Sequence, residues 1–161
     1  MIEGDEDGSE RPQPNEQTEV FGPIDGGALR EIRGLFAEME PLVETASLDD
    51  PLNPQTLSVE LSSGVGDAST ARFDVRWSLA GNYSFHYTDD RDRDFRFDCH
   101  SKPDAPRRHF HRPPEAPARP VEPSCITVRE PPLVTRAVLQ RWWYAYDRGT
   151  FDGINDAENP P

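Results

Sequence analysis

The residues of this chain that are best suited to chemistry lie in one short stretch. All four histidines fall between His86 and His111, together with the single lysine and five of the sixteen arginines. Imidazole groups accept and donate protons near neutral pH, and guanidinium groups bind phosphate through paired N–H donors. The stretch therefore predicts a site that combines acid–base chemistry with anion binding.

Alternating side chains place part of this stretch on one face of a sheet. Three consecutive segments between residues 72 and 100 alternate apolar and polar side chains, the pattern of half-buried strands. We expect a three-residue turn at 80–82 that pairs Trp77 with Phe85, followed by a hairpin that pairs Phe85 with Phe97. Both registers leave the polar side chains of the three strands together on the outer face.

The expected registers bring one histidine between two arginines, with Arg76 and Arg96 on either side of His86. The guanidinium groups keep His86 neutral as a base and clamp a phosphate, which is what RNA cleavage by attack of a 2′-hydroxyl requires. His109 or His111 would fold over the sheet as the acid. The candidate catalytic residues are therefore Arg76, His86, Arg96, Asp98, His109 and His111.

Two other interpretations of the same residues stay open. His109 and His111 form an H-x-H pair, but no second spaced pair of ligands accompanies it, so we assign no metal and no cofactor. A structural metal held by His100, His109 and His111 is the alternative, and it would bind zinc or nickel near one equivalent. An ordinary solvated face with weak ion pairs would present the same side chains.

The aromatic inner face of the strands needs a cover, and two amphipathic helices can supply it. Hairpin connections make the strands antiparallel. The sequence therefore predicts an α+β fold: a five-stranded, mostly antiparallel sheet with two helices on one face and an open polar face. The expected elements are a helix at 26–45 with Asp25 as N-cap, a strand at 56–62, the three strands above, a Pro-rich loop at 101–123, a fifth strand around Ile126 and Val128, and a helix near 132–147.

Length and composition predict one domain, at residues 24–148 of the 161. Residues 1–23 are acidic and residues 149–161 are polar, so we expect both to be disordered tails. The first residues lack the pattern of a signal peptide, and no segment has the ~20 apolar residues of a membrane span. Cys99 and Cys125 make no disulfide framework and are expected to be buried thiols in a cytoplasmic protein.

The charge of the chain is strongly acidic but unevenly distributed. The net charge is −13, with one lysine among its cations, which is typical of halophilic proteins because molar salt screens charge repulsion. An ordinary acidic protein from a GC-rich genome is the alternative. Residues 71–129 carry 11 basic and 9 acidic residues, so this region can hold an anion although the whole chain argues against broad nucleic-acid binding.

The chain has the run Phe95-Arg96-Phe97-Asp98, followed by a Pro-rich loop, the triplet His109-Phe110-His111 and a closing helix. In this order these features resemble the TumE-type family of small toxins, over roughly residues 56–147. Where the family loop carries a Pro-His-His step, this chain has Pro106-Arg107-Arg108. The resemblance implies a growth-inhibiting toxin that a neighbouring antitoxin neutralises and that acts on RNA. The residues that carry over are Arg96, Asp98, His109 and His111.

Two functions follow from the sequence. The first is a toxin-like component of a toxin–antitoxin system that acts as a metal-independent ribonuclease, with a cognate antitoxin and RNA as partners and no membrane. The alternative is a non-catalytic protein-interaction module of a halophilic cytoplasmic protein. A small gene beside this one would favour the toxin.

Overall fold

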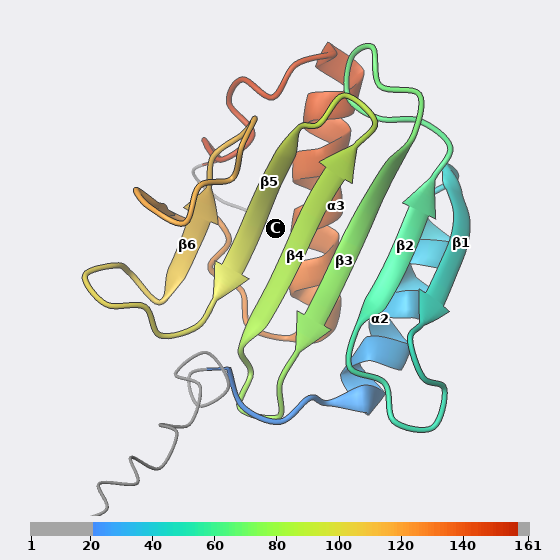
Figure 1. Cartoon of the computed structure of the whole chain (residues 1–161), viewed down its shortest axis with the longest axis vertical. Helices are drawn as coiled ribbons and strands as arrows, with labels where there is room; N and C mark the ends of the chain where they lie inside the picture. The colour runs from blue at the N-terminus through green and yellow to red at the C-terminus, as the bar shows by residue number, and fades with distance from the viewer. Residues whose placement is uncertain (1–20, 158–161) are drawn as a thin grey trace, which may run out of the picture.

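The computed structural model describes residues 21–157 and shows one antiparallel sheet with two helices packed on the same face. Each strand pairs with its neighbours in sequence, so the sheet order is β1-β2-β3-β4-β5-β6-β7. Figure 1 shows α2 and α3 behind the sheet, with the opposite face toward the viewer. In chain order the elements are α2 (Gly26–Met39), β1 (Val43–Leu48), β2 (Leu57–Leu61), β3 (Ala71–Trp77), β4 (Tyr83–Asp89), β5 (Asp94–Cys99), β6 (Arg108–His111), β7 (Glu122–Pro123) and α3 (Pro131–Arg148).

The predicted α+β fold, with two helices on one face of an antiparallel sheet, is confirmed, but the expected number of five strands is wrong. Residues 21–157 form seven strands. Two of the three additional strands, β6 and β7, lie within the expected loop at 101–123 and are only four and two residues long, too short to show a period. The expected fifth strand is also wrong, because Ile126 is buried but belongs to no strand.

The third additional strand, β1, occupies what the sequence suggested was the end of the first helix. Asp25 is the N-cap as predicted, since its side chain accepts a hydrogen bond from the Ala28 N–H at 3.0 Å. The helix ends at Met39 rather than at residue 45. Pro41 follows closely and cannot donate to a helical carbonyl, so the chain turns and pairs with β2.

The core lies between the helices and the inner face of the sheet and is rich in aromatic rings. Phe73 is at its centre and contacts the rings of Phe36, Tyr87, Phe95 and Trp142, with ring centroids 5.5–6.2 Å apart. The C-terminal helix is amphipathic as expected, and the following side chains of its inner face are all buried: Val134, Ala137, Val138, Trp142 and Ala145. After the helix, Phe151 and Ile154 also pack against the core.

The hairpin between β3 and β4 has a different register from the one expected. Trp77 pairs with Tyr83 and Val75 with Phe85, a shift of two residues that keeps the two faces distinct. Residues 78–82 connect the two strands, and Ser78 and Asn82 close this connection, with the Ser78 N–H donating to the Asn82 carbonyl at 2.8 Å. Leu79 is outside the strand and 69% exposed.

The β4–β5 register is confirmed, with Phe85 opposite Phe97 and His86 opposite Arg96. Both cysteines are free, Cys99 buried and Cys125 half-buried. Neither helix within residues 21–157 is long and apolar enough to cross a membrane. The predicted acidic tail lies outside the described residues as far as residue 20.

Candidate functional site

The outer faces of β5 and β6 together build a buried polar cluster. Antiparallel pairing sets Asp98 opposite His109 and Arg96 opposite His111, so the four side chains share one face. Asp98 is 2% exposed, and both His109 and His111 are fully buried. The expected open face is therefore closed over Asp98, His109 and His111.

One carboxylate oxygen is the centre of this cluster. Asp98 Oδ2 lies 3.1 Å from His111 Nε2, 3.3 Å from His100 Nε2 and 3.7 Å from His109 Nε2. Arg96 Nε is 2.9 Å from the same oxygen, and Arg96 Nη2 is 3.1 Å from His111 Nε2. Three imidazoles and one guanidinium thus converge on a single acid, which we call the Asp98 cluster (Arg96, Asp98, His100, His109 and His111).

Backbone carbonyls orient all three histidines in the same way. The Nδ1 atom of His111 lies 2.8 Å from the Pro117 carbonyl oxygen, and that of His109 lies 3.0 Å from the Pro106 carbonyl oxygen. His100 Nδ1 is 3.0 Å from the carbonyl of the next residue. Because a carbonyl only accepts, each Nδ1 carries the hydrogen, and each Nε2 points toward Asp98.

The charge of the cluster is set by its surroundings. Burial alone would raise the pKa of Asp98, but the neighbouring imidazoles and the charge of Arg96 outweigh it and hold that pKa well below its usual range. The hydrogen bond to Asp98 raises the pKa of His100, against the effect of its partial burial. Asp98 is therefore an anion across the physiological range.

Three buried atoms of the cluster have no hydrogen-bond partner among residues 21–157. These are Asp98 Oδ1, His109 Nε2 and Arg96 Nε, the last of which contacts Asp98 Oδ2 only as an ion pair. Buried polar atoms without a partner are costly and uncommon in folded proteins. The cluster is thus polar, enclosed and incompletely paired.

An accessible acid–base group lies beside the cluster, on the part of the sheet that stays open. His86 Nε2 is 3.0 Å from Asp94 Oδ1, and both side chains are about one third exposed. Arg96 lies opposite His86 on β5, with a side chain exposed to the same extent. On the other side of His86 is Asp74, which accepts a hydrogen bond from Arg72 at 3.0 Å.

The predicted position of Arg76 beside His86 is wrong. The shift in the β3–β4 register places Arg76 opposite Ser84, and Asp74 takes its expected place. The guanidinium carbon of Arg76 lies 4.2 Å from the centre of the Phe21 ring, a cation–π contact at the end of the sheet. The expected pair of arginines around His86 is therefore reduced to Arg96.

The catalytic set expected from the sequence left out two residues that the structure brings to the site. His100 was expected only as a ligand of the alternative metal site, and its spacing of two from Asp98 was the signal that it shares that face. Asp94 is likewise two residues before Arg96 on the same strand. Its contact with His86 is diagonal across the β4–β5 pair, so it could not be found without the exact register.

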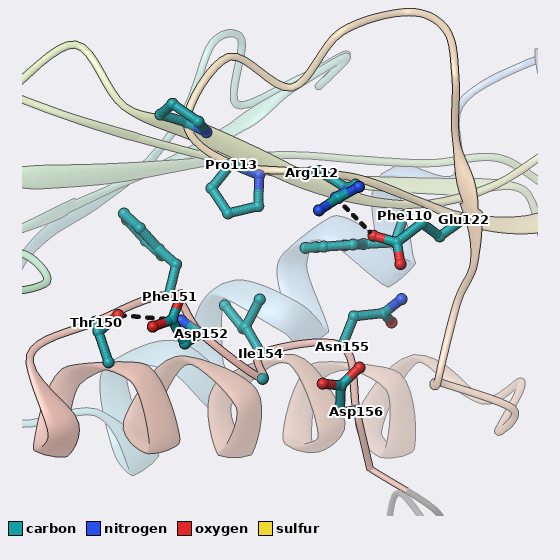
Figure 2. Close-up of a pocket in the computed structure, with 12 residues that line it drawn as sticks. Phe110, Arg112, Pro113, Glu122, Thr150, Phe151, Asp152, Ile154, Asn155 and Asp156 are labelled. Carbon is teal, nitrogen blue, oxygen red and sulfur yellow. Dashed lines mark hydrogen bonds and ion pairs between the residues drawn. The ribbon is translucent and has the colours of Figure 1, made fainter.

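A separate cavity of about 340 Å³ lies on the other face of β6, where the segment after α3 approaches the sheet. Figure 2 shows Phe110 and Phe151 in its wall, with the ion pair between Arg112 and Glu122 at 3.2 Å. Phe110 alternates with the histidines along β6, so this cavity and the Asp98 cluster are on opposite sides of the strand.

Comparison with known proteins agrees with the resemblance noted in the sequence. The family model described as toxin TumE matches residues 32–147. The chain belongs to the TumE toxin family. The match begins inside α2 and ends near the end of α3, so it extends further toward the N-terminus than the expected residues 56–147 and contains the whole Asp98 cluster and the His86–Asp94 pair. Neither a curated protein nor a solved structure matches the chain.

Proposed function

We propose that this TumE-family protein is the toxin of a toxin–antitoxin pair and that it arrests growth by cleaving RNA. The observation that carries the proposal is the His86–Asp94 pair at 3.0 Å beside Arg96, on an accessible part of the sheet. This pair supplies a base, and Arg96 supplies a cation for a phosphate.

The contacts of His86 define which nitrogen acts. The Nε2–H of His86 donates a hydrogen bond to the Asp94 carboxylate. Nδ1 therefore keeps the lone pair and serves as the base. His86 removes the proton from a ribose 2′-hydroxyl, and the 2′-oxygen forms a bond to phosphorus. The bond from phosphorus to the 5′-oxygen breaks, and that oxygen takes a proton from water. The products are a 2′,3′-cyclic phosphate and a 5′-hydroxyl.

Arg96 is suited to hold the phosphate because Asp98 positions its side chain. The guanidinium is anchored on one side by the ion pair with Asp98 Oδ2 at 2.9 Å, while about one third of the side chain remains exposed. Guanidinium groups bind phosphate oxygens through parallel N–H donors. The proposal leaves out Arg76, which is displaced, and it assigns no acid role to His109 or His111, whose rings are fully buried.

The proposal is tested by induced expression in a salt-tolerant host, with and without any adjacent small gene. We expect the wild type to arrest growth, His86→Ala and Arg96→Ala to lose the arrest, and the neighbouring gene product to relieve it. Arg72→Ala is the matched control, since Arg72 is an exposed arginine of the same face outside the proposed site.

The chemical readout is the RNA of arrested cells. New 2′,3′-cyclic phosphate ends that depend on His86 would support the mechanism. Arrest that survives in His86→Ala would contradict it. Arrest without new RNA ends would favour the alternative of a non-catalytic module that acts by binding another protein.

A further inference from the structure

We propose that the Asp98 cluster is a binding site for a divalent transition-metal ion such as zinc, with Asp98, His109 and His111 as ligands and His100 as the fourth. This inference does not rest on the proposed RNA cleavage, although Arg96 borders both sites. It rests on the geometry of the buried side chains and assigns the metal a structural role.

The spacing of the donor atoms fits such an ion. The donor atoms of Asp98, His109 and His111 all lie within 4.8 Å of one another. Three imidazole nitrogens are 3.1, 3.3 and 3.7 Å from Asp98 Oδ2. Around a tetrahedral zinc with metal–nitrogen distances of about 2.0–2.1 Å, neighbouring donors stand roughly 3.3 Å apart. Small side-chain shifts bring Asp98, His109 and His111 to that arrangement, whereas His100 lies outside this group of three and has further to move to become the fourth ligand.

The hydrogen bonds around the cluster are those that metal-binding histidines use. A histidine ligand commonly donates its other ring N–H to a carbonyl, which fixes the ring and leaves one nitrogen free for the metal. His100, His109 and His111 all place Nδ1 against a backbone carbonyl, at 2.8–3.0 Å. All three therefore aim an Nε2 atom at the same place.

The buried polar atoms without partners support a bound cation. His109 Nε2 and Asp98 Oδ1 are buried and form no hydrogen bond within the described part of the chain. Because His109 Nδ1 donates to the Pro106 carbonyl, its Nε2 offers only a lone pair, and the nearby Asp98 carboxylate also only accepts. A metal ion bound between these atoms would satisfy both.

Arg96 currently supplies the cation on one side of the cluster. Its Nη2 lies 3.1 Å from His111 Nε2, and its Nε is 2.9 Å from Asp98 Oδ2. A bound metal would repel this guanidinium, and the partial exposure of the side chain gives it room to move toward solvent. Arg96 thus competes with the metal for the cluster, and a variant without its charge provides a second test.

The location indicates a structural site rather than a catalytic one. Four protein donors complete a tetrahedral shell, and structural zinc sites are closed in this way. The ligands come from β5, its exit and β6, and the carbonyls from the Pro-rich segments on both sides of β6. The ion would therefore fasten the outer strands and these segments to the sheet.

The first experiment measures metal bound to the full chain. After incubation with zinc and removal of the excess, we expect about one equivalent per chain, and cobalt should give the absorption bands of tetrahedral Co²⁺. His109→Gln and His111→Gln should weaken zinc binding at least about 100-fold. His86→Gln is the matched control, because this histidine is on the same face but outside the cluster, and it should bind zinc as the wild type does.

The second measurement distinguishes a loss of zinc binding from a failure of the variant to fold. A chelator should lower the thermal midpoint of the wild type, and added zinc should restore it, because a ligand that binds the folded state stabilises it. Arg96→Gln should bind zinc at least about tenfold more tightly, since it removes a nearby positive charge. Folded wild type that takes up neither zinc nor cobalt, or weak binding that is equal in all variants, would overturn the proposal.

Discussion

The carboxylate of Glu40 accepts a hydrogen bond from the indole N–H of Trp142 at 3.0 Å, although 102 residues separate the two. The neighbouring Trp143 indole donates to the same oxygen. Glu40 follows α2 directly and is 3% exposed, so this buried acid connects the end of the first helix to the middle of α3. The region before β2 is therefore part of the domain and not an addition to it.

Removing this acceptor should destabilise the fold. Glu40→Ala leaves two indole N–H groups without their partner, and we expect a loss of about 2–3 kcal/mol in the free energy of unfolding. Glu40→Gln keeps an acceptor oxygen and should cost about 1 kcal/mol. Urea unfolding followed by tryptophan fluorescence measures both, and equal stability of Glu40→Ala and wild type would show that the contact is unimportant.

Substitution of two glycines by alanine should change the free energy of unfolding in opposite directions. A Cβ at Gly64 would lie 2.6 Å from Ala68 Cβ and 2.9 Å from the Tyr87 hydroxyl, whereas a Cβ at Gly34 has nothing within 4 Å. Gly64→Ala should cost about 1–3 kcal/mol through overpacking. Gly34→Ala, within α2, should gain up to about 1 kcal/mol. The same unfolding measurement compares them, and a neutral Gly64→Ala would contradict the packing described around Tyr87.

The role of Asp94 follows from the proposed RNA cleavage. Asp94 orients His86 and is a positioning residue, so Asp94→Ala should lower kcat for a defined RNA by about 10- to 100-fold and leave KM unchanged. Arg96→Ala should instead raise KM, because Arg96 binds the phosphate. Asp94→Asn keeps a hydrogen-bond acceptor and should recover part of kcat. A purely structural effect of Asp94 would change stability and both constants together.

The sequence predicted the central strands and α3 well because their side chains repeat over six or more residues. Phe73, Phe85 and Phe97 all face the core as expected. The β4–β5 register was predicted correctly, as one of the registers that match inward residues. The β3–β4 register was not, because a shift of two residues preserves both faces and only the closure by Ser78 and Asn82 decides it.

The candidate site was predictable in composition but not in arrangement. Arg96, Asp98, His109 and His111 do come together, since β5 and β6 pair. However, β6 is four residues long within a Pro-rich stretch, so periodicity could not show that it is a strand. The burial of His109 and His111 depends on Pro106 and Pro117, whose carbonyls reach the rings from irregular segments.

The order of the sheet has a consequence for how this toxin is made. Every strand pairs with its neighbour in sequence, so pairing can proceed step by step as the chain leaves the ribosome. The inner face is different, because α3 follows all seven strands and supplies Trp142 to the centre of the core. Until residues 131–148 have been synthesised, the part of that face that α3 covers remains exposed and the fold stays incomplete. Under the proposed function, a cognate antitoxin already present in the cell would have that interval in which to meet the chain before it can act.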